Sequence, residues 1–384
     1  MTTLRVKSAH GAYPVLIGCG ALNQLSTQIA KTLDGGRLFV IYDANLFALH
    51  GARFRPALKH WKYRAELVIP SGERHKNAAT LKGVYDFLLE QKVARDDLIL
   101  ACGGGVTSDL VGYAAATVLR GVRWGVVSTT LIGMADASIG GKTGINHRLG
   151  KNLVGAFWAP SFVVSAPEFL NTLPRRHLVA GLGEIIKCAG LSGTKEIARC
   201  ERFLERGDWS PKVWEPLIQQ AAAYKVAIVA ADEHETGRRV LLNYGHTFAH
   251  AIEAATGFGK LLHGEAVLLG VLAALKLGGK LGLDGQGLRK YAALAERAVG
   301  WAPRRKLNAD RILQAMAVDK KRQTADLKHV LLAAPGKPVV RGHIPPHRVR
   351  EALMEMLRYY EAHGGKGDKD SRHTRTESES ARRA

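Results

Sequence analysis

The sequence predicts a two-domain fold in which an α/β domain with a parallel sheet precedes a mostly α-helical domain. Three observations support this prediction. The 384 residues suffice for two separate hydrophobic cores. Roughly the first 130 residues alternate short β-rich runs with helical patterns. Long segments of helical periodicity dominate after about Pro167.

The α/β part is predicted from apolar runs of strand length. They are RLFVIY (37–42), AELVIP (65–70), DLILACGG (97–104) and VRWGVVST (122–129). A helical pattern such as 77–91 lies between such runs, and this alternation favours a parallel sheet covered by helices. The opening segments TLRVKS and YPVLIG can pair as a hairpin at the sheet edge.

The helical part is predicted from the periodic segments 213–232, 264–279 and 347–363. From Gly364 the chain is polar and charged, so we expect a disordered tail. The predicted division is therefore an α/β domain over 1–168, a helical domain over 169–363 and a tail over 364–384.

Composition narrows the class of protein. Apolar content of 46% and charged content of 23% are typical of a soluble globular chain, and no apolar run reaches the roughly 20 residues of a membrane span. The N-terminal stretch does not resemble a signal peptide. The four cysteines show no CxxC spacing, which fits a reducing compartment. We expect a cytoplasmic protein with no membrane partner.

The net charge of +21 suits either nucleic acid or a polyanionic small molecule. The basic residues are scattered along the chain, aromatic residues make up only 7%, and no nucleic-acid-binding module is recognisable. The sequence therefore favours a small anionic ligand over nucleic acid.

Two loops follow predicted strands. Gly103, Gly104 and Gly105 stand between a strand and a helix, where backbone amides at a helix N-terminus can hold a pyrophosphate. A purely structural turn would need only one or two glycines. In the second loop, Glu73 and Lys76 either meet a ribose or base, or form an ordinary helix-start turn, which is the simpler interpretation.

The glycine-rich stretch 128–160 carries isolated polar groups, namely Asp136, Lys142, Lys151 and Asn152. Glycine-rich chain with single lysines suits a closely wrapped anion, whereas the alternative is a surface loop. The apolar residues interspersed through the stretch count against the surface loop.

Histidines and a glutamate form a candidate metal site. His246 and His250 share one face of a predicted helix, and spacing alone favours them as the metal pair, with His263 at the start of the next helix. Glu184 and Lys187 lie three apart in an apolar helix, where a buried carboxylate needs a partner. A single histidine would more simply be a core residue. A cluster of several histidines with glutamate favours an open catalytic zinc site.

Together these motifs resemble the 3-dehydroquinate synthases, which belong to the sugar phosphate cyclases. The matching pieces follow the family's order over roughly residues 70 to 321: PSGERHK, GGGVTSDLVGYAAATVLRG, STTL…DASIGGKTGIN, GKNLVGAFWAP, GLGEIIK, LNYGHTFAHAIE, LHGEAV and DKK. The whole set is far more specific than any one motif.

The resemblance implies a Rossmann-like NAD-binding domain, a helical metal-binding domain and an active site in the cleft between them. It also revises the metal ligands to Glu184, His246 and His263, binding Zn²⁺ or Co²⁺ and leaving His250 to face substrate. The implied NAD contacts are Asp43, Asn45, Glu73, Lys76, Gly104, Gly105, Asp109, Thr129, Thr130, Lys142 and Lys151.

The resemblance implies a sugar phosphate as substrate, and it implies that the protein forms a homodimer. The substrate contacts would be Asp136, Lys142, Asn152, Lys187, Lys225, Arg239, Asn243 and His250, with Arg120 reaching across the dimer and Lys320, or else Lys321, at the phosphate. The implied reaction converts 3-deoxy-D-arabino-heptulosonate 7-phosphate to 3-dehydroquinate and phosphate by transient oxidation, elimination, re-reduction and aldol closure.

Several alternatives stay open. The segment LIGMADAS departs from the family pattern and points faintly to sedoheptulose 7-phosphate cyclases, although Arg239, Asn243, His250 and the Gly140–Lys142 run keep the dehydroquinate synthase form. An amino-dehydroquinate synthase would share nearly every motif. Metal- and NAD-dependent polyol dehydrogenases share the two-domain plan, and a basic nucleic-acid-binding protein is the non-enzymatic alternative.

Overall fold

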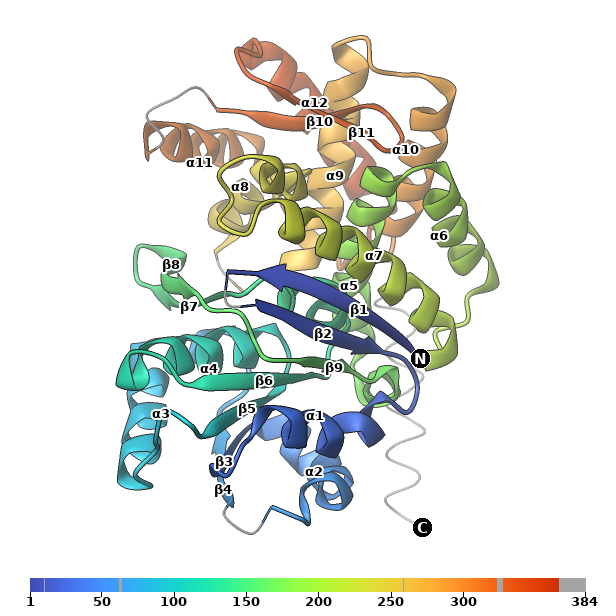
Figure 1. Cartoon of the computed structure of the whole chain (residues 1–384). Coiled ribbons are helices and arrows are strands. Elements are labelled where there is room, and N and C mark those ends of the chain that lie inside the picture. Colours follow the sequence, from blue (N-terminus) through green and yellow to red (C-terminus); the bar gives the residue numbers. More distant parts are fainter. Residues whose placement is uncertain (10, 62–63, 258, 323–326, 366–384) are drawn as a thin grey trace, which may run out of the picture. The chain divides into compact units, whose positions relative to one another are not determined.

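The computed structural model describes residues 1–9, 11–61, 64–257, 259–322 and 327–365, without the side chains of 318–322 (Figure 1). Its contacts divide the chain into two compact units. Unit 1 comprises Met1–Leu173 and Trp209–Thr236, and unit 2 comprises Pro174–Asp208 and the chain from Gly237 on. The predicted tail lies, from residue 366, outside the described residues.

The sequence predicts that the helical domain begins after residue 168. The observed units differ mainly because one long helix beyond that boundary groups with the sheet. Helix α7 (Pro211–Ala231) belongs to unit 1 rather than to the helical unit. It packs along strand β1 (Thr2–Ser8), against the π-helical turn η4 (Gly133–Ala137) and against the 3-10 turn η5 (Pro167–Thr172). The helix leaves its sequence neighbours because its apolar face is buried by these segments of unit 1.

Unit 1 is built on a seven-stranded sheet in the order β1-β2-β9-β6-β5-β3-β4. The further strands are β2 (Gly11–Ile17), β3 (Leu38–Asp43), β4 (Arg64–Ile69), β5 (Leu98–Gly103), β6 (Arg123–Ser128) and β9 (Val163–Ser165). All neighbours are parallel except β1 and β2, which form an antiparallel hairpin from Thr2↔Ile17 to Ser8↔Gly11. The predicted parallel sheet and edge hairpin are both confirmed.

The strand order places the glycine-rich turn at a switch point of the sheet. The chain runs from β3 outward to β4 and then returns past β3 to β5, which is buried along its whole length. In open parallel sheets, ligands bind outside the carboxyl ends of strands at such a reversal. Helices α1 (Leu25–Thr32), α2 (Ala44–Leu58), α3 (Ala78–Glu90) and α4 (Gly105–Thr117) complete this part of the unit.

The glycine-rich stretch 128–160 folds as η4 followed by a separate two-stranded hairpin. Strands β7 (Lys142–His147) and β8 (Gly150–Phe157) pair antiparallel, and β7 packs on α4. Gly140 and Gly141 precede the hairpin with φ of 100° and 65°, a backbone region that residues other than glycine rarely adopt. The segment is therefore regular structure beside α4 rather than a loop, although strand β8 is largely exposed.

Unit 2 is a helical assembly around α9 (His263–Lys280), which is buried on nearly every side. Its other elements are α5 (Arg175–Ser192), α6 (Thr194–Arg206), η6 (Arg238–Asn243), α8 (His246–Thr256), α10 (Gln286–Val299), α11 (Ala309–Arg322), α12 (Pro346–His363), β10 (His329–Ala334) and β11 (Lys337–Arg341). Helices α5, α8, α10 and α12 pack directly on α9. The sheet unit and the helical unit together confirm the predicted fold class.

Two glycines set the approach of α5 to α9. A Cβ atom at Gly183 would collide with the Gly264 carbonyl, and one at Gly264 would collide with the Ala180 carbonyl. The backbones of the two helices therefore touch directly at this point. Because Gly183 precedes Glu184 and Gly264 follows His263, the contact brings these two polar side chains together.

Candidate metal centre and nucleotide-binding site

Three polar side chains of unit 2 converge from three different helices. Glu184 lies in α5, His246 begins α8 and His263 begins α9. The Glu184 Oε1 atom lies 3.6 Å from His246 Nε2 and 3.4 Å from His263 Nε2. One ligand atom from each residue lies within 4.8 Å of the other two. The structure thus brings together the metal ligands that the resemblance implies.

The spacing of these atoms fits a divalent ion better than direct hydrogen bonding. Ligand atoms around a tetrahedral zinc ion at about 2.05 Å lie roughly 3.4 Å apart. Separations of 3.4 and 3.6 Å are long for an N–H···O hydrogen bond. Both Glu184 oxygens are buried without an aligned hydrogen-bond partner in the described structure, although Lys187 Nζ lies 2.6 Å from Oε2. The three residues therefore fit a metal ion.

The electrostatics of the cluster favour an ionised carboxylate. Burial of Glu184 opposes its ionisation, but the Lys187 ammonium and the two imidazoles outweigh burial and hold its pKa well below the usual range. For His246, burial first and the Lys187 charge second lower the pKa. A neutral imidazole is the form that metal ligation requires, and His246 meets this condition. Burial opposes protonation of His263, but Glu184 and Glu253 outweigh burial and raise its pKa to about 10, so a metal ion would have to displace a proton from this residue.

His250, which helical spacing alone favours as a ligand, lies at the edge of the same cluster. Its ring centroid is 5.4 Å from that of His246 and 6.1 Å from that of His263, and the residue is exposed. A second set of potential ligands also gathers here, formed by His250, Glu253 and His263. The sequence pattern cannot choose between the sets, because Glu184 and His263 approach through tertiary packing of α5 on α9.

Two groups that sequence reasoning missed hold the outer nitrogens of the histidines. Glu253 Oε2 lies 3.1 Å from His263 Nδ1, and the Tyr244 carbonyl oxygen lies 3.3 Å from His246 Nδ1. Glu253 is 3% exposed. Its position seven residues after His246, on the same face of α8, is the signal that could have identified it.

The start of α9 is anchored by a further carboxylate that the sequence analysis did not single out. Glu265 accepts a hydrogen bond from the Leu262 backbone N–H at 2.7 Å, and it is bound by Arg176 through Nε at 2.7 Å. This arrangement satisfies a backbone donor at the helix start. It also fixes the position from which His263 projects.

The other predicted substrate residues of unit 2 lie on α5, η6 and α8. Lys187 and Arg239 are each 1% exposed, Asn243 is half-buried and His250 is exposed. Lys320 and Lys321 belong to α11, but their side chains lie outside those that the structure describes.

In unit 1, the glycine-rich turn leads directly into a helix. Strand β5 ends at Gly103, Gly104 is the N-cap of α4, and no side chain caps that helix. A Cβ atom at Gly104 would lie 2.7 Å from the Thr130 side chain, and one at Gly105 would lie 3.0 Å from the Ala137 Cβ. The turn therefore requires glycine, and the first backbone amides of α4 are suited to an anion.

The predicted adenosine-side residues lie at the carboxyl ends of β3 and β4. Asp43 caps α2, and its Oδ1 accepts hydrogen bonds from the Asn45 N–H at 2.9 Å and the Leu46 N–H at 3.2 Å. The Ser71 hydroxyl donates to the same oxygen at 2.6 Å. This carboxylate is consequently held in one orientation at the edge of the sheet.

A polar network joins the loop after β4 to α4 and the β7–β8 hairpin. Lys76 pairs with Asp109 and donates to Asn152 Oδ1 at 2.6 Å. Glu73 Oε1 accepts a hydrogen bond from Asn146 Nδ2 at 2.7 Å. Burial raises the pKa of Asp109, while the Lys76 charge opposes the rise. Asn146 is a member of this network that sequence reasoning missed.

Thr129 and Thr130 follow β6 beside the glycine-rich turn. The Thr129 N–H donates to the Gly103 carbonyl at 2.9 Å, and the Thr130 hydroxyl oxygen accepts from the Gly133 N–H at 3.2 Å. Lys151 lies half-buried on β8. The two threonines therefore lie beside the turn.

Three cationic residues predicted at the substrate differ in their surroundings. Lys225 Nζ lies 2.9 Å from Asp136 Oδ1 and donates to the Asp136 carbonyl at 2.8 Å. Lys142 pairs with Glu235, a residue that the sequence analysis did not predict. Arg120 is exposed and adopts φ of 63°.

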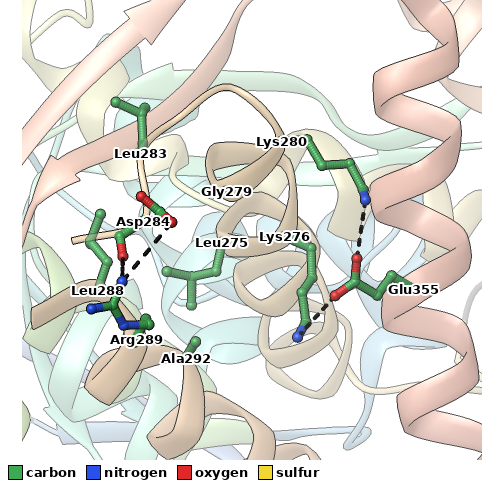
Figure 2. Close-up of a pocket in the computed structure, with 10 residues that line it drawn as sticks. All are labelled: Leu275, Lys276, Gly279, Lys280, Leu283, Asp284, Leu288, Arg289, Ala292 and Glu355. Atoms are coloured by element: carbon green, nitrogen blue, oxygen red, sulfur yellow. Dashed lines mark hydrogen bonds and ion pairs between the residues drawn. The ribbon is translucent and has the colours of Figure 1, made fainter. Parts of the chain in front are cut away.

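A separate surface pocket of unit 2, shown in Figure 2, contains none of the predicted site residues. It has a volume of about 320 Å³ and lies between α9, α10 and α12. Its lysines pair with a carboxylate of the same pocket, because Lys276 and Lys280 each approach Glu355 to 3.3 Å. This pocket is therefore separate from the cluster of Glu184, His246 and His263.

In the described parts of the chain, every helix is too short or too polar to cross a lipid bilayer.

Comparisons with known proteins agree on one family. Residues 66–180 match the family described as 3-dehydroquinate synthase N-terminal, and residues 181–322 match 3-dehydroquinate synthase C-terminal. A 3-dehydroquinate synthase from Methylococcus capsulatus is 40% identical over 88% of this chain and 94% of its own length.

Solved structures show the same architecture. The 2-epi-5-epi-valiolone synthase ValA of Streptomyces hygroscopicus, solved with NAD⁺ and Zn²⁺, is 28% identical with a TM-score of 0.80, covering 93% of this chain and 99% of its own. A 2-deoxy-scyllo-inosose synthase solved with NAD⁺ and Co²⁺ has a TM-score of 0.81 at 23% identity, covering 92% of this chain and 99% of its own. The latter likeness concerns the fold alone.

Proposed function

The chain belongs to the 3-dehydroquinate synthase family, and on this premise we propose that it converts 3-deoxy-D-arabino-heptulosonate 7-phosphate to 3-dehydroquinate and phosphate. The observation that carries the proposal is the convergence of Glu184, His246 and His263 in a chain 40% identical to a named synthase. The product places the enzyme in the shikimate pathway of aromatic amino acid biosynthesis.

We propose NAD at the glycine-rich turn of unit 1 and a divalent metal, Zn²⁺ or Co²⁺, at the cluster of unit 2. The structural neighbour solved with NAD⁺ and Zn²⁺, which is 28% identical, supports NAD and a divalent ion. When bound, NAD supplies a reversible hydride acceptor and the metal supplies a Lewis acid. In the proposed sequence a ring hydroxyl is oxidised, phosphate is eliminated with the adjacent proton, the ketone is reduced again, and ring opening precedes intramolecular aldol closure.

The residues of the chain would hold the two anionic ends of the substrate. Lys142, Arg120 and Lys320 are proposed for the phosphate, and Lys225 and Arg239 for the carboxylate, since ammonium and guanidinium groups match these anions. Arg239 is 1% exposed and already has a partner within the chain, so a substrate carboxylate would share this guanidinium with that partner. The ion pair of Lys142 with Glu235 means that phosphate would compete with a carboxylate for this lysine.

The remaining predicted contacts would orient the sugar ring. Asp136, Asn152, Lys187, Asn243 and His250 offer donors and acceptors for hydroxyl groups. Holding the ring in one orientation contributes to rate by making each step effectively intramolecular. A homodimer with Arg120 at its interface and a cytoplasmic location stay predictions.

The decisive experiment measures phosphate release by the purified protein. We expect release from 3-deoxy-D-arabino-heptulosonate 7-phosphate, loss of release with a chelator, and recovery on adding Zn²⁺ or Co²⁺. No net NADH should accumulate, because the hydride returns. Net NADH formation from a polyol would instead identify a dehydrogenase and overturn the proposal.

Two sister reactions need the same assay with other substrates. Release from the amino analogue of the heptulosonate phosphate, in preference to the heptulosonate itself, would identify an amino-dehydroquinate synthase. Release from sedoheptulose 7-phosphate would identify a cyclase of secondary metabolism. The residue types at Arg239, Asn243 and His250 match those of the dehydroquinate synthase motif, which favours the heptulosonate phosphate over sedoheptulose 7-phosphate as substrate.

A further inference from the structure

Glu253 is a buried carboxylate beside the candidate metal centre, outside the three residues that face the ion. It lies in α8, is 3% exposed and directs Oε2 to within 3.1 Å of His263 Nδ1. A buried carboxylate needs a compensating partner, and the imidazole of His263 provides one. The contact is therefore a built part of the site rather than a surface pairing.

The two ring nitrogens of His263 face different groups. Nε2 lies 3.4 Å from Glu184 Oε1, and Nδ1 faces Glu253. A neutral imidazole carries one proton, and the nitrogen without it is the one that can bind a metal. If the proton resides on Nδ1 and is donated to Glu253, the lone pair of Nε2 points toward Glu184 and His246.

His246 shows the same arrangement with a weaker acceptor. Its Nδ1 lies 3.3 Å from the Tyr244 carbonyl oxygen, while Nε2 faces Glu184. Both candidate ligands thus have an oxygen acceptor at Nδ1 and present Nε2 to the same carboxylate. This common orientation is expected if the outer acceptors fix the tautomer of each ligand.

We propose that Glu253 is a positioning residue, which fixes the tautomer and ring orientation of His263 so that Nε2 faces the metal. The proposal rests on the metal centre assigned under the proposed function. His263 has particular need of such a partner because its side chain is 36% exposed, whereas that of His246 is 12% exposed and more confined by packing.

The same residues could instead form a second metal site, since His250, Glu253 and His263 also gather within ligand distance. In that arrangement Glu253 would itself bind an ion, and His263 would have to use Nδ1. The imidazole of His263 would then have to bridge two ions, with one ion at each nitrogen. We favour the positioning role, because it assigns one function to each nitrogen of His263.

The test measures metal binding directly on the full-length chain and not through turnover. Metal-free wild type, Glu253→Gln and Glu253→Ala are titrated with Co²⁺ and Zn²⁺ against a competing chelator, and the visible spectrum of the Co²⁺ form is recorded. We expect one ion per chain in all three proteins and an affinity loss of about 10- to 100-fold for Glu253→Ala. The Co²⁺ spectrum should change, and Glu253→Gln should retain part of the affinity because its amide oxygen still accepts a hydrogen bond.

A matched control is Glu355→Gln, which makes the same chemical change on α12 of unit 2 and removes ion pairs with Lys276 and Lys280 (Figure 2). It should bind Co²⁺ as wild type does. Melting temperatures of the metal-free proteins show whether a variant has lost its fold, in which case Glu253→Gln carries the comparison.

Other outcomes would overturn the proposal. Wild-type affinity and spectrum in both Glu253 variants would remove any positioning role. Binding of two ions by wild type and one by Glu253→Ala would identify the second metal site. Failure of wild type to bind any ion would overturn the metal centre itself. If the Glu253 variants lose metal affinity as expected but wild type releases no phosphate, only the proposed reaction would be overturned.

Discussion

At the scale of single residues, the sites depend on charges that compensate each other away from water. Lys187 lies 2.6 Å from Glu184, and Lys76 pairs with Asp109, in each case with a lysine side chain no more than 4% exposed. Removing one member of a buried pair leaves the other charge without compensation, which costs more than the pair itself contributes. These residues therefore combine a site role with a structural one.

This reasoning predicts the effect of Lys76→Met on unit 1. Asp109, whose side chain is 20% exposed, would lose its cation, so we expect the free energy of unfolding to fall by about 2 kcal/mol, less than for a fully buried pair. The double variant Lys76→Met/Asp109→Leu should recover much of that loss, because it removes the orphaned charge. Denaturant unfolding of the single and double variants measures both values. Equal stability of wild type and Lys76→Met would show that the pair is effectively solvated.

His329 gives a pH-dependent prediction. Burial lowers its pKa to about 4, whereas the unfolded chain titrates near the ordinary value of about 6.5. Between these values the unfolded state binds a proton that the native state does not, so stability falls as pH drops from 6.5 toward 4. Above pH 6.5 the residue should have no such effect.

The corresponding experiment compares wild type with His329→Leu in the metal-free form. Wild type should lose about 3 kcal/mol more than the variant between pH 7 and pH 4, because the shift spans about 2.5 pKa units. Urea unfolding at several pH values supplies the two curves. Parallel curves would contradict a buried neutral imidazole in β10.

At the scale of elements, the metal centre depends on the direct contact of α5 with α9. Gly183 and Gly264 each leave no room for a Cβ atom, and each adjoins a ligand of the centre. Helix spacing is consequently coupled to the distance between Glu184 and His263. A change in packing at this contact would therefore alter the geometry of the proposed metal centre without replacing one of its ligands.

We therefore expect Gly183→Ala to lower both stability and metal affinity. The added methyl group would push α9 away, at a cost of about 1–3 kcal/mol, and would separate the ligands. The matched control is Gly279→Ala in α9, where no heavy atom lies within 4 Å of an added Cβ. That variant should gain up to about 1 kcal/mol from helix propensity. Chemical unfolding measures the stability and Co²⁺ titration measures the affinity. Unchanged Co²⁺ affinity in Gly183→Ala would contradict the idea that helix packing sets the distance between the ligands.

The elements were largely predictable from sequence, because strand and helix periodicity is local. The segments 37–42, 97–104 and 264–279 fold as β3, β5 and α9 with boundaries shifted by one to a few residues. The grouping of α7 with unit 1 was not predictable, because it depends on which segments bury its apolar face. Nor did spacing identify the partner of His263 as Glu253, since the contact between α8 and the start of α9 is tertiary.

At the scale of the whole molecule, the chain comprises two compact units with separate cores and separate proposed ligands. A ligand that binds only the native state raises stability by an amount that grows with its concentration relative to its Kd. NAD is proposed for unit 1 and the metal for unit 2. The two ligands should consequently stabilise different parts of the chain.

Calorimetry tests this expectation. We expect two transitions, of which a chelator lowers only the one that melts unit 2, while NAD raises only the one that melts unit 1. At a metal concentration of 100 Kd the stabilisation should be about 2.7 kcal/mol. A single transition that responds to both ligands would show that the two units unfold as one cooperative body.

His246 and His263 are each the first residue of a helix, so the positive ends of two helix dipoles lie beside the proposed metal centre. Each dipole repels a nearby cation by about 0.3–1 kcal/mol, and the repulsion from two helix starts adds. The same ligands placed away from a helix start would therefore be expected to bind a cation more tightly. We therefore expect the metal content of a preparation to depend on the Zn²⁺ and Co²⁺ concentrations of its buffer, which metal analysis after dialysis against each ion would measure.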